Sequence, residues 1–293
     1  MIAYYFKQLF YKAIIHKWEL AFIETPIDDV LQGKKLDFRY VKHQYRNRWF
    51  ADPFILSFNE QEIRLLVEDY SDRDRLGKIS RLIIDRYSYE VKDVKIVLSL
   101  ETHLSFPAIK RENGKIYIYP ENNKAGGLWL YEYDLEEEKC KEVKRLCDDP
   151  LTDAIQTNLF GSSLIFSTRE PAPNSNILNI YSSVNDVFSN VTQIVSFEEN
   201  IARNAGDFFE FKGEYYRPAQ VCNDAYGQAV SLQKITGSIS NFNFEEVRRI
   251  YPPNNAFGLH TFNVYKDMIV VDIRVFRYPW IAIPIYALYR KIR

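Results

Sequence analysis

Three aspartates precede recurring turns at similar distances, and their spacing suggests paired carboxyl chemistry. Asp52 and Asp153 each lie eight positions before the second residue of such a turn. Asp207 lies six positions before Gly213, which keeps the same side-chain parity because side chains alternate along a strand. Opposed carboxyl groups suit glycosidic chemistry, in which one protonates the leaving oxygen and another activates water or attacks carbon. We therefore predict that Asp52, Asp153 and Asp207 are catalytic candidates.

Other polar residues stand at the start of the same strands or at the end of the strands that return beside them. Buried Arg and Glu side chains need partners, and they either pair with one another or hold a polyhydroxylated or phosphorylated ligand. The alternative for each Asp, Asn or Ser is a local turn cap, and for an aromatic side chain a place in the core. The predicted substrate-binding residues are His103, Ser105, Asn204, His260, Glu68, Glu121, Arg169, Arg217, Asp272 and Trp49.

The elements that position these residues are revealed by five similar turns. The second residues of the turns are separated by 54, 47, 52 and 54 positions, and each turn joins an apolar segment to an alternating one. A period of about 50 residues with three or four strands in each unit is typical of a β-propeller, which buries both faces of every blade. The turns are Asn59-Glu60, Asn113-Gly114, Phe160-Gly161, Lys212-Gly213 and Lys266-Asp267.

These repeats predict an all-β fold, a five-bladed β-propeller without a second domain. The predicted propeller covers residues 18–293, and the strand 18–24 completes the last blade and closes the ring. The inner strand of each blade lines the central axis, so the candidate residues meet there. The alternative is a β-sandwich or another all-β fold with five chance hairpins. The predicted blades are 49–101, 102–148, 149–200, 201–254 and 255–293.

Residues 1–17 predict a short amphipathic helix with a basic character. Lys7, Lys12 and Lys17 accompany apolar residues at helical spacing, and no acidic residue occurs before Glu19. The helix either packs on the propeller or makes peripheral contact with an anionic membrane surface. The lysines interrupt the apolar run too early for a spanning helix, and no signal cleavage site follows. We therefore expect a cytoplasmic protein; if the helix contacts a membrane instead of the propeller, the contact is peripheral at the inner membrane face.

The composition narrows the function classes. The 21 Tyr and 20 Phe residues favour strands, and the net charge of -1 gives no support for a nucleic-acid partner. The three cysteines lack metal-ligand spacing and predict reduced thiols. The chain has no Gly-rich phosphate loop, nucleophile elbow or zinc motif, so no cofactor and no metal is predicted. A divalent cation between the three aspartates is unsupported by ligand spacing.

Four motifs carry a resemblance to a known family. They are Trp49 to Phe54, His103 to Pro107 with Asn113-Gly114, Tyr216 to Gln220, and Gly258-Leu259-His260-Thr261. From about Trp18 to its end the chain resembles the propeller domain at the amino end of plant glucosamine inositolphosphorylceramide transferases. Stand-alone bacterial proteins of surface-polysaccharide gene clusters share this domain.

The resemblance extends to the five-bladed fold of glycoside hydrolase family 43. In those hydrolases an aspartate in an Asp-Pro context is the general base, and Asp52 matches that position. Their general-acid glutamate motif is not found, so the resemblance implies glycan or glycolipid biosynthesis rather than simple hydrolysis.

Together, these observations predict a carbohydrate-active protein that handles a glycosyl substrate during cell-surface polysaccharide or glycolipid assembly. The expected partner is a glycan, glycolipid or nucleotide sugar. The alternatives are a non-catalytic glycan-binding or scaffold propeller, and a glycoside hydrolase.

Overall fold

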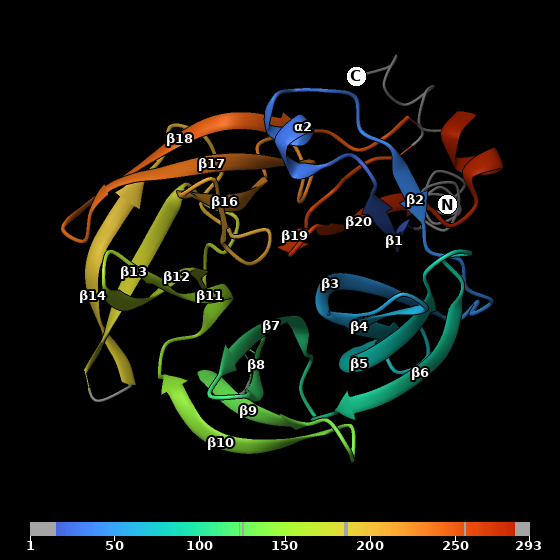
Figure 1. The fold of residues 1–293 in the computed structure, drawn as a ribbon, viewed down its shortest axis with the longest axis horizontal. Coiled ribbons are helices and arrows are strands. Elements are labelled where there is room, and N and C mark those ends of the chain that lie inside the picture. Colours follow the sequence, from blue (N-terminus) through green and yellow to red (C-terminus); the bar gives the residue numbers. More distant parts are fainter. Residues whose placement is uncertain (1–15, 123, 125, 185–186, 255, 285–293) are drawn as a thin grey trace, which may run out of the picture.

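The protein forms a ring of five antiparallel sheets around a central axis, as Figure 1 shows. The structure is a computed structural model that describes residues 16–122, 124, 126–184, 187–254 and 256–284. Within these residues each sheet has four strands, and its first strand lies nearest the axis (Figure 1). The expected five-bladed β-propeller is therefore confirmed.

The first three blades follow one another without interruption in the sequence. Blade I consists of β3 (Arg48–Phe58), β4 (Glu62–Ser71), β5 (Leu76–Asp85) and β6 (Val91–Leu98). Blade II consists of β7 (Ser105–Glu112), β8 (Lys115–Glu121), β9 (Leu128–Asp134) and β10 (Lys139–Cys147). Blade III consists of β11 (Leu151–Leu159), β12 (Ser162–Arg169), β13 (Ile177–Val184) and β14 (Val187–Ser196).

The last two blades include the strands that close the ring. Blade IV consists of β15 (Phe209–Phe211), β16 (Glu214–Val221), β17 (Ala229–Ser238) and β18 (Asn241–Ile250). Blade V consists of β19 (Phe262–Tyr265), β20 (Met268–Phe276), β1 (His16–Ile23) and β2 (Phe38–Tyr40).

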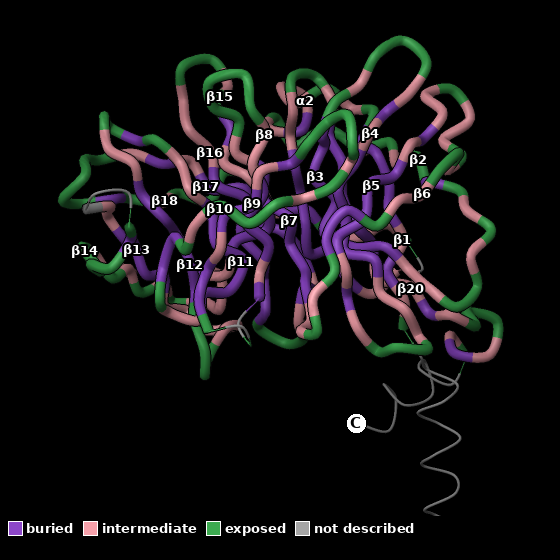
Figure 2. Tube along the Cα trace, turned by 90° about the horizontal axis from the view of Figure 1, so that it is seen from below, coloured by how far each residue is buried: buried purple, intermediate pink, exposed green. Residues whose placement is uncertain are grey.

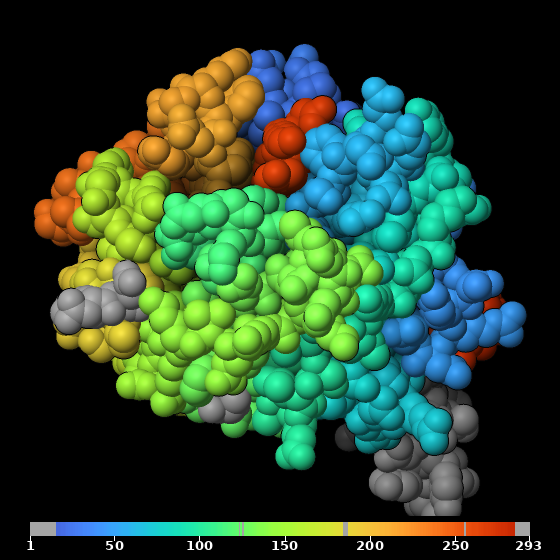
Figure 3. Space-filling model, turned by 60° about the horizontal axis from the view of Figure 1, so that its bottom comes forward, coloured from blue at the N-terminus to red at the C-terminus, as the bar shows by residue number. Residues whose placement is uncertain are grey.

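Ring closure joins the two ends of the described chain in blade V. β1 pairs antiparallel with β20 from His16 opposite Phe276 to Ile23 opposite Ile269. In the space-filling view, the red carboxyl-terminal strands accordingly lie between blue and orange parts of the chain (Figure 3). Closing blade V with β1, the first strand among the described residues, ties the two described ends together, as expected for the segment 18–24.

The amino-terminal segment differs in detail from the prediction. His16 and Lys17 belong to β1 rather than to the predicted helix 1–17, and the rest of that helix lies outside the described residues. The segment between β1 and β2 contains the short helix α2 (Ile27–Leu31), and β2 follows it as the edge strand of blade V.

The five turns that align the repeats all link the first two strands of a blade. Three of them place a residue with positive φ before a glycine with positive φ: Asn113 at 51° and Gly114 at 75°, for example. Two left-handed residues in succession match the twist of a tight hairpin. We call the end of the propeller with these turns the turn face, and the opposite end, where each first strand begins, the starting face.

The core lies between adjacent blades rather than within one sheet. Leu66 on β4 packs with residues of blade II, such as Phe106 and Ile118. Its neighbours Leu65 and Val67 point to the other face of the sheet and pack with blade V. Burial on both faces explains why the inner strands are continuously apolar rather than alternating, and Figure 2 shows the buried residues concentrated in the middle of the ring.

Two further observations concern the cysteines and the helices. Cys140, Cys147 and Cys222 are free thiols, as predicted. Among the described residues, no helix is both long enough and apolar enough to cross a bilayer.

Candidate functional site

A bulge at the start of the inner strand sets the position of the site residues in blades I to III. Asp52, Phe106 and Asp153 have positive φ values of 49°, 46° and 46°. At each of them the register between the first two strands shifts. Such a bulge bends the strand and redirects a side chain. Each of these residues stands eight positions before the second residue of its turn, so the spacing found in the sequence reflects a shared backbone feature.

Asp207 lies at a different depth from Asp52 and Asp153. In blade IV, Asn204 pairs with Ala219 at the level of the bulge, and Ala205 stands eight positions before Gly213. Asp207 is two residues further along, which is about 7 Å along a strand. Burial raises the pKa of Asp207 to about 7, although a hydrogen bond from the Phe208 backbone N–H and the charge of the nearby Arg111 guanidinium both lower it. Asp207 therefore lies nearer the turn face than Asp52 and Asp153, in the segment before β15 rather than within a strand.

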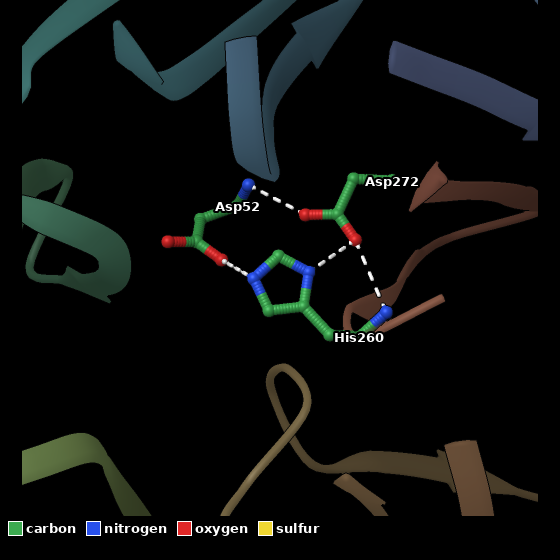
Figure 4. A group of neighbouring side chains, drawn as sticks. All are labelled: Asp52, His260 and Asp272. Carbon is green, nitrogen blue, oxygen red and sulfur yellow. Dashed lines mark hydrogen bonds and ion pairs between the residues drawn. The ribbon is translucent and has the colours of Figure 1, made fainter. Parts of the chain in front are cut away.

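Asp52, His260 and Asp272 form a buried carboxylate–imidazole–carboxylate chain (Figure 4). Nε2 of His260 lies 3.2 Å from Oδ1 of Asp52, and Nδ1 lies 2.6 Å from Oδ1 of Asp272. The backbone N–H of Asp52 donates to the other Asp272 oxygen at 2.9 Å. His260 and Asp272 come from the two ends of one hairpin in blade V, whereas Asp52 comes from blade I.

The two carboxylates keep the imidazole charged. Burial by itself lowers the pKa of His260, but the charges and hydrogen bonds of Asp272 and Asp52 outweigh it and raise the pKa to about 10. The ring of Trp18 stacks on the imidazole with centroids 3.9 Å apart, and Tyr226 meets its edge at 5.3 Å. An imidazolium between two carboxylates leaves one net negative charge on the group.

The same three residues form the one potential metal-ligand group found in the described part of the chain. Their ligand atoms lie within 4.8 Å of one another. Both ring nitrogens of His260 already face a carboxylate oxygen, and the raised pKa favours N–H on both. A metal ion at this place would have to displace a proton from the imidazolium, so the donor set fits an ion network better than a metal centre.

Glu68 and His103 form a second pair beside Asp52. Nε2 of His103 lies 3.2 Å from Oε1 of Glu68, and Nδ1 accepts a hydrogen bond from the Gly77 N–H at 3.0 Å. Burial raises the pKa of Glu68 to about 7; His103 opposes the rise and the Asp52 charge adds to it. Glu68 also raises the pKa of His103, but protonation of Nδ1 would break the bond from Gly77. With Nδ1 accepting from Gly77, the ring proton of neutral His103 lies on Nε2 and is directed at the Glu68 carboxyl.

Asp153 is the centre of a separate ion network on the same face. Its Oδ2 accepts from Nε of Arg203 and from Nε2 of Gln220, both at 2.6 Å, and its N–H donates to Glu121 at 3.0 Å. Arg203 also lies 3.5 Å from Glu121. Burial and the negative charge of Asp153 raise the pKa of Glu121 well above its usual range, and the positive charge of Arg203 only partly offsets this rise.

Tyr226 connects the two networks. Its ring lies against the imidazole of His260 and 5.0 Å from the Arg203 guanidinium. Burial raises its pKa; Arg203 opposes the rise, and the charges of Asp153, Asp52 and Glu121 add to it. Asp52 and Asp153 therefore influence the same phenol, although no direct contact between them is found among the described residues.

The site also holds the blades together. Within the described residues, each of the five blade junctions carries at least one hydrogen bond near the starting ends of the inner strands. The pairs are Asp52–Asp272, Phe106–Asp52, Asp153–Glu121, Asn204–Asp153 and Phe262–Ala205, at 2.9, 3.0, 3.0, 2.8 and 2.7 Å. Asp52 and Asp153 therefore carry structural bonds, whatever chemistry they perform.

Two predicted binding residues are wholly interior. Arg217 has no exposed surface, and it donates to Asn204 at 2.9 Å, to Gln233 at 2.7 Å and to the carbonyl oxygen of Ala202. Asn204 is equally buried and also bonds the carbonyl oxygens of Asp153 and Phe166. These hydrogen bonds hold the backbone segment next to Arg203 in place, and neither side chain is exposed to a ligand.

The remaining predicted residues are spread along the starting face. Trp49 stacks on Tyr70 with ring centroids 4.5 Å apart, and Tyr70 in turn lies 6.1 Å from His103. Ser105 is buried opposite Glu121. Arg169 pairs with Asp149 at 3.4 Å at the exposed end of β12, and among the described residues it is not found in contact with either network.

Sequence reasoning missed three residues that complete the networks: Trp18, Arg203 and Gln220. Gln220 lies in a motif that carried the family resemblance, so that motif was the available signal. Arg203 directly precedes Asn204, but only the structure shows that Arg203 is partly exposed while Asn204 is buried. Trp18 reaches His260 only because β1 closes blade V.

The fold defines the class of protein first. The structure is similar to a glycoside hydrolase family 43 β-xylosidase/α-arabinofuranosidase from a compost metagenome, with a TM-score of 0.52 at 12% identity over 76% of this chain and 84% of that chain. It is also similar to a family 43 enzyme of Xanthomonas citri solved with xylose, with a TM-score of 0.53 at 10% identity over 79% and 88% of the two chains. At such identities the likeness establishes a five-bladed propeller of this kind.

The sequence comparisons then identify the family. Residues 39–271 match the model of the glucosamine inositolphosphorylceramide transferase 1 amino-terminal domain, so the chain belongs to that family. It is 33% identical over 201 residues to glucosamine inositolphosphorylceramide transferase 1 of Oryza sativa subsp. japonica and 30% identical over 197 residues to that of Arabidopsis thaliana. The matches cover 65% and 64% of this chain but only 27% and 26% of the relatives.

Proposed function

We propose that the starting face of the propeller binds the glycosyl part of a glycolipid or nucleotide sugar and supports glycosyl transfer during glycolipid or surface-polysaccharide assembly. The observation that carries this proposal is the pair of ion networks around Asp52 and Asp153, joined by Tyr226. The relatives carry the name glucosamine inositolphosphorylceramide transferase, which favours a sugar or inositol phosphate headgroup as the ligand.

The partly exposed groups have the chemistry that such a ligand needs. Glu121, Arg203 and Tyr226 retain some accessible surface, and 38% of the His103 side chain is exposed. A carboxyl, a guanidinium, a phenol and an imidazole supply acceptors and donors for hydroxyl groups, and the guanidinium also suits a phosphate. Trp49 and Tyr70 supply apolar ring surface beside them.

The acid and base assignments follow from the surroundings of two carboxyl groups. Glu68, with a pKa of about 7, holds a proton for much of the neutral range and is the candidate acid. Asp52 receives hydrogen bonds from the His260 imidazolium and the Phe106 N–H, so it is the candidate base or nucleophile. The sequence predicted Asp153 and Asp207 as catalytic candidates and Glu68 as a substrate-binding residue. This proposal instead gives the acid role to Glu68.

One observation favours a second candidate, a non-catalytic glycan-binding propeller. Asp52 is only 4% exposed, and each of its carboxylate oxygens already has a protein partner. In this alternative the networks shape the binding surface and perform no chemistry.

Substitution of Asp52 by Asn separates the two candidates. We expect Asp52→Asn to retain binding of a glucosamine-containing inositol phosphate, measured by calorimetry, and to lose product formation in a reconstituted membrane assay with labelled nucleotide sugar. Asp207→Asn is the matched control, since that carboxyl lies nearer the turn face. Unchanged product formation by Asp52→Asn would rule out the catalytic form, and absence of binding by the wild-type protein would rule out both.

A further inference from the structure

The outer edge of blade III is a surface that the candidate site does not use. β14 is the last strand of its sheet, and among the described strands it pairs with β13 alone. It lies at the rim of the ring, far from the central axis (Figure 1). An edge strand of this kind keeps a free row of backbone N–H and C=O groups, which can pair with another chain.

β14 differs from the other outer strands because it carries no charged residue. Its 10 residues are of the types Val, Phe, Ser, Asn, Thr, Gln and Ile. Proteins protect exposed edges against pairing with charged side chains, and the outer strands of the other four blades follow this rule. Their charged residues are Lys92, Asp93 and Lys95 in β6, Lys139, Lys141, Glu142, Lys144 and Arg145 in β10, Glu245, Glu246, Arg248 and Arg249 in β18, and Arg39 in β2. Within the described blades, β14 is therefore the outer strand that lacks this protection.

The exposed side chains of β14 are aliphatic or neutral and polar. Val187, Val191 and Ile194 are 41%, 37% and 60% exposed. The exposed polar residues are Ser189, Asn190, Thr192 and Ser196. β-Branched residues favour strands that pack against neighbours, so β14 has the composition of a paired strand at a position where its outer edge is unpaired.

The backbone of the last part of β14 is regular and directs two residues outward. The register between β13 and β14 has no shift over residues 193–196. Directly after them, the Phe197 N–H donates to the Asn176 carbonyl oxygen at 2.9 Å. In an antiparallel pair, alternate residues bond to the same neighbouring strand. Ile194 and Ser196 therefore direct their N–H and C=O groups away from β13.

A second copy of this chain is the partner that fits this edge best. Where two identical antiparallel strands meet about a twofold axis, residues near the axis face their own copies, so a charged residue there meets a like charge. A neutral strand avoids this repulsion, whereas β6, β10 and β18 do not. The net charge of -1 also leaves little repulsion between whole copies. Both observations favour self-association.

We infer that β14 pairs with β14 of a second copy about a twofold axis through Ile194, so that two four-stranded sheets join edge to edge. In this arrangement the outward N–H and C=O groups of Ile194 bond to those of its copy. One pair of strands buries little surface, so we expect a weak dimer that depends on concentration. The self-association does not depend on glycan binding, because β14 lies outside the candidate site.

Sedimentation velocity of the full chain tests the self-association. We expect a monomer in dilute solution and a dimer as the concentration rises to about 500 μM. Ile194→Lys should raise the dissociation constant of the dimer about tenfold or more, because two lysines then face each other across the axis. The matched control is Val143→Lys, since Val143 is 47% exposed on β10, the outer strand of blade II. A monomer at every concentration, or equal effects of the two substitutions, would overturn the inference.

Disulfide formation tests the position of the axis. Directly paired residues of this kind have Cα atoms about 5.5 Å apart, a separation that a disulfide can span. Ile194→Cys should therefore form a cross-linked dimer with a copper–phenanthroline oxidant, and reduction should reverse it. Val143→Cys, which retains the three native thiols, should form little of this product. Equal cross-linking of both variants, or none in Ile194→Cys, would refute pairing about Ile194. Neither measurement involves a sugar, so failure here leaves the proposed function to its own test.

Discussion

Nε2 of His260 lies 3.2 Å from Oδ1 of Asp52, which joins the last blade of the ring to the first through a buried ion pair. The same imidazole is held from its other side by Asp272 at 2.6 Å. The contact combines two functions: it contributes to ring closure, and it fixes the orientation of the candidate base or nucleophile.

Removing the His260 cation should destabilise the fold strongly. His260→Gln leaves the Asp52 and Asp272 carboxylates buried without their shared charge, and breaking a buried pair in this way costs about 3–5 kcal/mol. The measurement is the free energy of unfolding in urea. Adding Asp52→Asn should recover part of the loss, because one unpaired carboxylate disappears with it. Additive losses in the double variant would contradict the coupling.

Stability should fall as the pH rises from about 6.5 to 10. The folded pKa of His260, about 10, lies above its unfolded value, so its contribution is complete below pH 6.5 and is lost as the pH passes the folded value. A shift of this size corresponds to about 3–5 kcal/mol. Urea unfolding across this range should show the decline in the wild type and a flatter profile in His260→Gln. Parallel profiles would show that His260 is not the titrating group.

Glu68 should titrate near pH 7 in the folded protein, well above its usual range. Carbon NMR of the labelled carboxyl measures this directly. His103→Ala should raise the pKa further, because the hydrogen bond from Nε2 favours the ionised carboxylate. Since the folded pKa is raised, the contribution of Glu68 to stability is complete below about pH 4.5 and is lost as the pH rises through 7. Titration near 4.5 would exclude Glu68 as the acid.

Two arginines should respond in opposite ways to replacement by lysine. Arg217→Lys should lower the free energy of unfolding by about 2–4 kcal/mol, because buried carbonyl and amide acceptors lose their donor, with ligand affinity retained by the folded protein. Arg203→Lys should weaken ligand binding, since a single ammonium group cannot serve Asp153 and a ligand together. Calorimetry and urea unfolding on both variants test the assignment. An equal loss of affinity in the two variants would contradict it.

The sequence by itself determined the number of blades and the position of Asp52 along the inner strand of its blade. Five turns at a period of about 50 residues specify five hairpins, because a tight turn needs particular residues wherever it occurs. The eight-residue spacing of Asp52 and Asp153 likewise reflects a local bulge. The eight-residue spacing does not hold for Asp207. In blade IV, Ala205 occupies the corresponding position, and Asp207 lies two residues further along the chain.

Only the tertiary structure decided which side chains meet. His260 and Trp18 come to Asp52 through closure of blade V, and Arg203 comes to Asp153 through packing of blade IV on blade III. Burial then decided their surroundings, since Arg217 is enclosed by carbonyl and amide oxygens, while burial beside Asp52 raises the pKa of Glu68 to about 7. Local sequence patterns encode turns and strand parity, whereas contacts between blades and the resulting charge states depend on residues that are distant along the chain.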